Sequence, residues 1–493
     1  MERRLSSWSA AVCLASAIGC TQANGASPAV GTGEDDVIAA AVADPGPRTG
    51  AVGAGDALAN STAAEVALFG EGRETFKEID SVSGGIAGEE GKGLGPTFNH
   101  NSCAGCHAEP VVGGSSPHPT LGFVKTPNPQ IALATLNRIS PAWYQKVPSF
   151  ITADGPVREA RFVKNADGTD DGGVHGLFTI AGRIDAPDCR LAQPDFAAEL
   201  ANDNVIFRIP TPTYGLGLIE AITDDALSAS FNATTKARSN LGIGGRFNRS
   251  GNDGTITRFG WKAQNKSLLI FAGEAYNVEQ GVSNEVFPDE RTTSPGCNVN
   301  PTPEDKSDNE SRGSGTGGQM ASDTVNFANF MRLAAPPKSA TASPSETNGA
   351  ALFASIGCAL CHTPTLATGP SRFAGLSNVT FHPYSDVAIH HMGPGLADHV
   401  AQGGAGADEF RSAPLWGVGQ RIFFLHDGRA GPKNGGLVRA ILAHQSTNPN
   451  CRGNQKTTPD GVACRSEANQ VIDRFRDLRT SEKQDVVNFL RSL

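Results

Sequence analysis

The sequence predicts a mainly α-helical protein of two unequal domains with long loops and few short strands. Three observations support this prediction. A short cysteine–histidine motif occurs twice, the sequence around each copy repeats in the other half, and a Pro/Ser-rich linker at 336–347 separates the halves. The 58 Gly and 31 Pro residues indicate many loops. We therefore expect an N-terminal domain at 61–335 and a C-terminal domain at 348–493.

Residues 1–20 resemble a secretory signal. Arg3 and Arg4 precede an apolar stretch of small residues that ends at Cys20, as in a lipoprotein signal whose cysteine becomes lipidated. Secretion without a lipid is the alternative. Residues 21–60 lack apolar periodicity and predict a flexible tether. We expect a periplasmic or otherwise exported protein that touches a membrane only through a lipid anchor on Cys20.

The repeated motif is C-x-x-C-H, at Cys103–His107 and at Cys358–His362. Two cysteines three positions apart can form thioether bonds with the two vinyl groups of one porphyrin, and the imidazole that follows then faces the iron. A structural zinc site would need further ligands nearby, and a redox dithiol would not need the histidine. The motifs therefore predict two covalently bound haem c groups in cytochrome c-like domains, attached through Cys103, Cys106, His107, Cys358, Cys361 and His362.

Export makes the remaining cysteines of the mature chain candidates for disulfide bonds. Cys451 and Cys464 flank a short polar loop and predict a local pair. Cys189 and Cys297 then form the other pair. Because no C-x-x-C remains outside the haem motifs, a dithiol mechanism would lack its residues.

The two halves also resemble each other beyond the motifs. Pro212–Gly217 matches Pro414–Gly419 in every fixed position, and a Gly-x-x-x-Phe segment precedes each motif. Each half continues into a helical run whose apolar face ends on one polar residue, Glu279 in the first half and His444 in the second. Such a residue would point into the core, where a haem is expected. The alternatives are a solvent-exposed carboxylate and a core histidine bonded to a backbone carbonyl.

Longer matches identify a family. They are Leu94–Cys103, Gly215–Ile222, Arg258–Ala263, Pro383–Asp386, His391–Asp398, Pro414–Gly417 and Leu425–Ala430. From about residue 66 to the C-terminus, the chain resembles the di-haem oxidoreductase family, whose members are labelled peroxidases or thiol oxidoreductases. That family is related to the bacterial di-haem cytochrome c peroxidases.

The resemblance implies a division of labour between the haems. In the peroxidases one haem keeps an open or displaceable sixth position and reacts with peroxide, and the other is six-coordinate and passes electrons. Here it implies a substrate-reactive N-terminal haem and a C-terminal haem that accepts electrons from a small carrier protein. The implied metal ligands are His107 in the first half and His362 with His444 in the second, Met392 being the alternative to His444.

The resemblance also implies catalytic residues. Glu279 resembles the acid–base glutamate of relatives, and Glu220 is the alternative. Peroxide cleavage moves a proton from one oxygen to the other, and a carboxyl group in a dry pocket has a raised pKa suited to that. Trp261 resembles the tryptophan between the two haems, which can relay electrons; a packing role is its alternative. His100 and His118 flank the first motif and are candidates for the sixth position of its haem.

The sequence departs from the family near the C-terminal haem. His391 replaces an aspartate, and residues 431–436 replace a compact helix start. Peroxidase relatives also hold calcium (Ca2+) between their domains. The acidic stretch 167–171 is the candidate here, although it lacks the spacing of an EF-hand.

The composition restricts the partners. A net charge of −9 and a pI near 5.7 argue against nucleic acid. Two functions remain. One is a redox enzyme of peroxidase type that acts on a small oxidant or another substrate. The other is a non-enzymatic electron-transfer protein with two low-spin haems.

Overall fold

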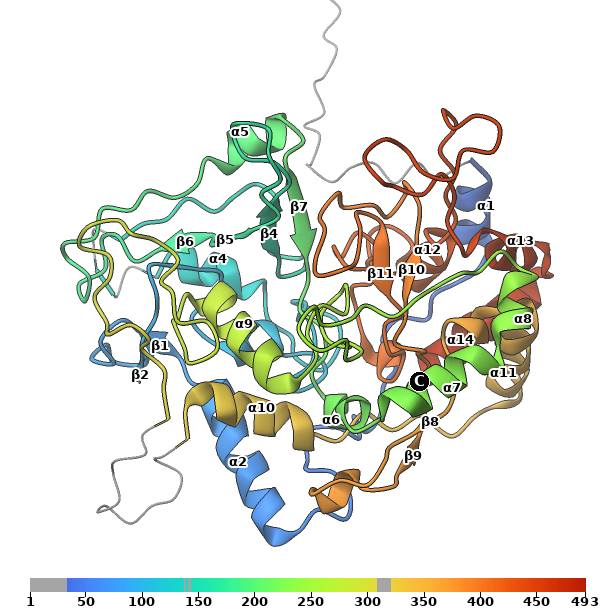
Figure 1. The fold of residues 1–493 in the computed structure, drawn as a ribbon, viewed down its shortest axis with the longest axis horizontal. Helices are drawn as coiled ribbons and strands as arrows, with labels where there is room; N and C mark the ends of the chain where they lie inside the picture. The colour runs from blue at the N-terminus through green and yellow to red at the C-terminus, as the bar shows by residue number, and fades with distance from the viewer. Residues whose placement is uncertain (1–32, 137–138, 141–142, 308–320) are drawn as a thin grey trace, which may run out of the picture.

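The computed structural model describes residues 33–136, 139–140, 143–307 and 321–493, so the expected signal at 1–20 lies outside the described residues. As predicted, the described chain consists mainly of helices and loops, with few short strands (Figure 1). The α-helices are α1 Gly33–Ala41, α2 Ala63–Lys77, α3 Cys103–Cys106, α4 Pro129–Ala134, α5 Phe196–Ala201, α6 Leu216–Glu220, α7 Asp224–Ala233, α8 Thr235–Ser239, α9 Leu268–Gln280, α10 Asp323–Leu333, α11 Pro344–Ile356, α12 Gly436–Leu442, α13 Asn469–Asp477 and α14 Thr480–Ser492. The short 3-10 helices are η2 Cys358–Leu360, η3 Ala374–Leu376 and η4 Val418–Gln420.

The described strands form small sheets of two or three strands. They are β1 Asp80–Ser81, β2 Gly91–Lys92, β3 Thr97–Phe98, β4 Glu159–Phe162, β5 Val174–His175, β6 Phe178–Thr179, β7 Val205–Arg208, β8 Leu366–Ala367, β9 Thr380–Phe381, β10 Ile389–His391 and β11 Glu409–Arg411. The described three-stranded sheet has the order β5-β4-β7 and is antiparallel, with Ala160 opposite both His175 and Phe207. Among the two-stranded pairs, β1 and β2 run parallel and the others antiparallel.

Each half of the chain contains two helices that pack closely at a glycine. α2 packs against α10, and α11 packs against α14. A methyl group on Gly72 of α2 would lie 2.3 Å from a backbone oxygen of α10, and one on Gly349 of α11 would lie 1.9 Å from a backbone oxygen of α14. Such close contact leaves no room for any larger residue. α2 and α11 also begin in the same way, with capping boxes at Thr62 and Ser343.

The repeated Pro–Gly segment forms the same turn in both halves. Gly215 and Gly417 have φ of 73° and 72°, a left-handed conformation that favours glycine, and each opens a short helix, α6 or η4. A methyl group on Gly217 would lie 1.9 Å from a backbone oxygen in α10, and one on Gly419 would lie 2.1 Å from a backbone oxygen in α14. The repeat in the sequence therefore corresponds to a repeated helix-and-turn arrangement.

The sequence predicts a tether at 21–60, and its described part makes contacts with both halves: residues 33–48 contact the C-terminal half, and Leu58 donates its N–H to Leu333 of α10. α1 lies beside α12 and α13 (Figure 1), and its Asp36 pairs with Arg439 at 2.5 Å. Asp44 accepts two hydrogen bonds of 2.7 Å from Arg491. These arginines follow their partners by 403 and 447 positions. Partners so distant in the sequence leave no local pattern that periodicity could reveal.

The two halves of the chain are in contact. α7 and α8 lie along the C-terminal half (Figure 1). Leu241 and Ile243, which follow α8, pack with Val471 and with the second haem motif. The expected linker 336–347 ends inside a helix, because α11 begins at Pro344. The second motif therefore lies between residues of both halves.

Both predicted disulfide bonds are present, Cys189–Cys297 and Cys451–Cys464. Among the described residues, the free cysteines are the four of the two motifs. None of the described helices has both the length and the apolar character needed to cross a membrane.

Candidate functional site

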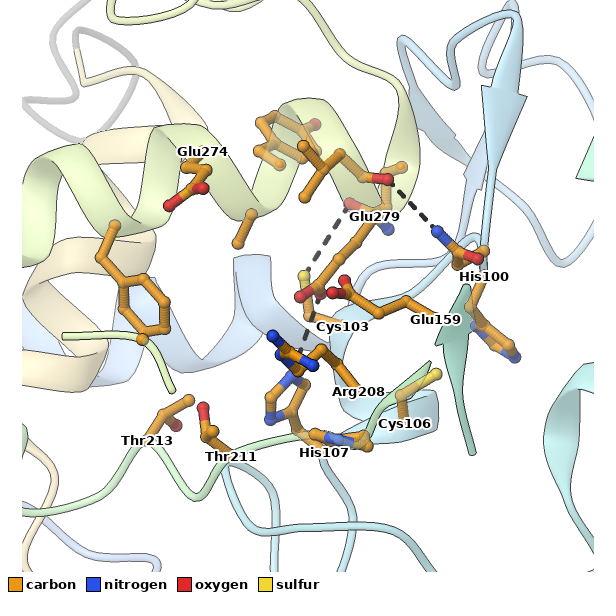
Figure 2. A pocket seen from close by; sticks show the side chains of 18 of the residues that line it. His100, Cys103, Cys106, His107, Glu159, Arg208, Thr211, Thr213, Glu274 and Glu279 are labelled. Atoms are coloured by element: carbon orange, nitrogen blue, oxygen red, sulfur yellow. Dashed lines mark hydrogen bonds and ion pairs between the residues drawn. The ribbon is translucent and has the colours of Figure 1, made fainter. Parts of the chain in front are cut away.

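The first motif lies in a cavity beneath α9. Cys103 and Cys106 of α3 and the adjoining His107 line this first cavity. α9 begins at its N-cap Ser267, and Glu279 in its last turn points toward His107 (Figure 2). The structure therefore brings the expected acid–base residue to the first motif.

The His107 imidazole presents one nitrogen to the cavity. Its Nδ1 donates to Gly114 O at 3.2 Å, so Nε2 is the atom left for a ligand bond. Burial lowers the pKa of His107 to about 4, which keeps the imidazole neutral at pH 7 and its Nε2 lone pair free. The nearest atom of Glu279, Oε2, lies 3.9 Å from this Nε2.

The Glu279 carboxyl group lines the first cavity. Burial, followed by the charges of Glu159 and Glu274, raises its pKa to about 8, against the opposing charge of Arg161. Its side chain retains 34% of its exposure and forms no hydrogen bond with the described residues. A carboxyl group with a pKa near neutrality can both give and take a proton.

The second motif lies in a largely apolar cavity. The Nδ1 atom of His362 donates to Tyr384 O at 3.0 Å, and the Nδ1 atom of His444 donates to Ala440 O at 2.7 Å. Both imidazoles line this second cavity with Nε2 as the free nitrogen, so the carbonyl bond expected of a core histidine leaves His444 able to bind a metal. Burial, followed by the charge of His444, lowers the pKa of His362 to about 4. Met392 lines the same cavity.

The phenylalanine of the repeated Gly-x-x-x-Phe segment has the same place in both halves. Phe76 packs against the ring of His107 and Phe353 against that of His362, with centroid distances of 5.9 and 6.3 Å. Each motif histidine is therefore held by a backbone carbonyl on one side and an aromatic ring on the other.

Two arginines that line the second cavity have buried nitrogen atoms without hydrogen-bond partners among the described residues. Nη1 of Arg411, and Nε and Nη2 of Arg421, are buried and form no hydrogen bond within the described chain. Burial lowers the pKa of both guanidinium groups, that of Arg411 to about 10. A buried charge without a counter-ion is strongly unfavourable, so the cavity is complementary to an anion. The empty space of the cavity, including open solvent at its mouth, is about 1410 Å³. A haem, with its apolar ring and its two carboxylate side chains, fits this apolar and cationic lining.

Replacing Arg421 with Gln is expected to lower the reduction potential of the C-terminal haem. The substitution removes a cation that offsets the negative charge of the haem carboxylates, so the oxidised, more positive iron becomes favoured. Redox titration followed at the Soret band measures the change. Arg452→Gln, the same loss of charge at an exposed position, is the control and leaves the potential unchanged; equal potentials in all three proteins would contradict the assignment.

Trp261 lies between the two cavities. It is the one described residue that lines both. Its indole N–H donates to Ile209 O at 3.2 Å, which fixes the ring. On the side of the second cavity, the ring lies edge-on to His426 at 6.4 Å, and His426 stacks on Phe410 at 4.4 Å. This is the placement expected of an aromatic relay.

Sequence reasoning did not single out Arg411, Arg421 or His426. His426 belongs to the matched segment Leu425–Ala430, so the family pattern contained a signal for it. No such signal exists for the two arginines, because the absence of a partner is a property of the folded state.

The alternative site residues are placed differently. Glu220 lines neither cavity; it pairs with Arg332 at 2.6 Å and accepts a bond from the N–H of Leu268, the first residue of α9. His118 also lines neither cavity, and its Nδ1 accepts a backbone N–H at 3.2 Å. His100 lines the first cavity, and its Nδ1 lies 3.1 Å from Ser102 N and 3.2 Å from Ser102 O. Of the two candidate acid–base residues, the geometry favours Glu279 over Glu220.

The departures from the family pattern have local explanations. His391 bonds through Nδ1 to Asp408 at 2.9 Å. Where residues 431–436 replace the expected helix start, the carboxylate of Asp44 accepts the Leu437 N–H at 2.8 Å. The N-terminal segment therefore supplies the cap that α12 lacks locally.

The acidic stretch 167–171 does not gather into a metal site. Asp170 pairs with Lys164, and Asp171 lies 3.3 Å from the His175 ring. Across the described ranges, no group of three or more His, Cys, Asp or Glu side chains is arranged to hold a metal ion.

One comparison with known proteins, a family model, identifies a family for this chain. Residues 158–492 match the family model described as "Di-haem oxidoreductase, putative peroxidase". A solved structure of a MauG-like protein associated with microbial copper homeostasis is similar at 14% identity and a TM-score of 0.23, over 36% of this chain and 55% of the other. No curated protein matches the chain. The family match includes the second motif and begins after the first.

Proposed function

Because the chain belongs to the di-haem oxidoreductase family, we propose that it is an exported redox enzyme of peroxidase type with two covalently bound haem c groups. The N-terminal haem reacts with a small oxidant such as hydrogen peroxide. The C-terminal haem takes electrons from a small carrier protein. Export follows from the signal-like residues 1–20, with Cys20 as the candidate for a lipid anchor.

The proposal depends mainly on one observation. In the first cavity the carboxyl group of Glu279 lies 3.9 Å from the motif histidine, whereas in the second the imidazole of His444 lines the cavity together with the motif histidine and its charge lowers the pKa of that histidine. A second imidazole completes the coordination of an iron and leaves no place for a substrate. A carboxyl group carries protons and is an easily displaced ligand. The first cavity is therefore suited to reaction and the second to electron transfer.

The repeated architecture supports two cytochrome c-like haem domains. Each half has the glycine-packed helix pair, the left-handed glycine turn and the phenylalanine beside the motif histidine. The free cysteines of the described chain lie at these two places. We propose that they form the thioether bonds.

Different residues of the chain would transfer the protons and the electrons of the reaction. When bound, each haem supplies an iron that changes its charge by one electron. Reduction of hydrogen peroxide to two water molecules takes up two electrons and two protons. Glu279, the carboxyl group nearest to His107, moves a proton from one peroxide oxygen to the other. Trp261 connects the cavities through which the electrons pass.

Replacing Trp261 with Phe is expected to slow electron transfer between the haems while both stay bound. The smaller ring leaves a gap between the cavities and loses the hydrogen bond to Ile209 O, which alone contributes about 0.5–1.5 kcal/mol. Flash reduction with absorbance detection measures the rate. Trp143→Phe is a control, because the Trp143 indole N–H also donates to a carbonyl at 3.2 Å but Trp143 lines neither cavity. Equal slowing by both substitutions would remove Trp261 from the electron route.

The electron paramagnetic resonance (EPR) spectrum of the ferric and half-reduced protein tests the proposal. We expect one high-spin haem, which binds added cyanide, and one low-spin haem. Two low-spin haems that stay unchanged after partial reduction would instead establish the non-enzymatic electron-transfer protein.

A further inference from the structure

The distance between His107 Nε2 and Glu279 Oε2 is the distance expected between two ligand atoms on opposite sides of one metal ion. Imidazole nitrogen and carboxylate oxygen bind first-row transition metals at about 2 Å, as zinc sites show, so a linear N–metal–O arrangement spans about 4 Å. His107 Nε2 and Glu279 Oε2 are 3.9 Å apart. In Figure 2 the carboxyl group points directly at the imidazole.

A carboxyl group that only transfers protons would lie farther away. It would form a hydrogen bond to a ligand oxygen on the iron, which adds about 2.7 Å beyond that oxygen. The observed 3.9 Å leaves no room for such an oxygen between Glu279 and the iron position. The Glu279 side chain also accepts no hydrogen bond from the described residues, although the charge of Arg161 acts on it across the cavity.

The position of Glu279 relative to the first motif is fixed by the backbone. Its carbonyl oxygen accepts the N–H of Asn99 at 2.7 Å, and the carbonyl of Gln280 accepts the N–H of Gly95 at 2.9 Å. A methyl group on Gly95 would lie 1.9 Å from the backbone oxygen of Gly281. The end of α9 is therefore attached to the segment that leads into Cys103, so a rigid frame sets the spacing.

We infer that the Glu279 carboxylate is the sixth ligand of the N-terminal haem iron in the resting oxidised protein and must leave before an oxidant binds. The inference rests on the proposed function, because it assumes the haem on His107. It gives Glu279 two successive roles: it occupies the coordination position at rest and, once displaced, lies beside the bound oxidant as the proton carrier. The 34% exposure of its side chain to the cavity gives it space to move aside.

Isotope labelling of water tests this ligand in the full-length protein with both haems bound. A carboxylate is a weak-field ligand, so the resting N-terminal haem is expected to be high-spin. EPR in water enriched in oxygen-17 shows whether the sixth ligand is a water molecule, because its nucleus broadens the high-spin lines. We expect no broadening in the natural protein and clear broadening in Glu279→Ala, where water takes the vacated position.

Cyanide binding provides a second readout that does not depend on turnover. In the natural protein the observed rate should level off at high cyanide, because departure of the carboxylate becomes limiting, whereas in Glu279→Ala it should rise linearly. Glu285→Ala, an exposed position soon after α9, should behave as the natural protein does. Broadened lines together with a linear cyanide rate in the natural protein would overturn the inference but leave the peroxidase proposal intact. A low-spin N-terminal haem that does not bind cyanide would overturn both. If Glu279→Ala does not fold, the natural protein decides: unbroadened lines with a cyanide rate that levels off support the inference, and a linear cyanide rate overturns it.

Discussion

Replacing Glu279 with Gln is expected to lower the turnover number for peroxide reduction about 10²- to 10⁴-fold, the usual contribution of general acid–base catalysis. Glutamine keeps the size of the side chain but cannot carry a proton. Both haems should remain bound, because the motif residues are unchanged. The measurement is steady-state reduction of hydrogen peroxide by a reduced one-electron donor, with haem content checked by the absorbance of the pyridine complex.

The control for this substitution is Glu285→Gln. Glu285 is exposed and only accepts bonds from Ser307, so its variant should retain the natural rate. Undiminished turnover in Glu279→Gln would remove this residue from the proton transfer. A fall in haem content parallel to the fall in rate would instead show a role in binding alone.

Replacing His444 with Ala is expected to convert the C-terminal haem from low-spin to high-spin. Removing the imidazole takes away a nitrogen ligand whose Nδ1 bond to Ala440 O fixes its orientation. Added imidazole should enter the space left and restore the low-spin spectrum. Because the electron-transfer haem then lacks its ligand, donor-driven turnover should fall as well. Optical and EPR spectra of the ferric variant measure the change.

Met392→Leu is the matched comparison, because Met392 lines the same cavity. It should leave the low-spin spectrum intact and shift the potential only slightly. The opposite pattern, with an unchanged His444→Ala spectrum and a high-spin Met392→Leu spectrum, would make the thioether the ligand and raise the expected potential of this haem.

Features that depend on local chemistry could be predicted from the sequence. The two C-x-x-C-H motifs name their own ligands, and the disulfide between Cys189 and Cys297 followed from the cysteines left over. The repeat around Gly215 and Gly417 could be recognised because a left-handed turn requires glycine. For these cysteines, histidines and glycines, the residue type alone indicates the bond or the backbone conformation that the residue adopts.

Features that depend on distant partners could not. Asp36 and Asp44 lie in a segment whose composition is typical of a flexible tether. Only the folded chain brings Arg439 and Arg491 close to them. Glu220 and Glu279 both lie in segments that the sequence predicts to be near the first haem motif. The ion pair of Glu220 with Arg332, which only the structure shows, distinguishes the two residues. The sequence identified candidates for the site, and long-range packing decided among them.

The most direct test of the central claim, that one haem reacts and the other conducts, is a single-turnover experiment. Half-reduced protein is mixed with one equivalent of hydrogen peroxide in a stopped-flow instrument, and the two haems are followed by their separate Soret bands. The account predicts that the N-terminal haem changes first, at a rate that depends on peroxide, and that the C-terminal haem is oxidised afterwards, more slowly in Trp261→Phe. A C-terminal haem that reacts first, or no change in either haem, would contradict it.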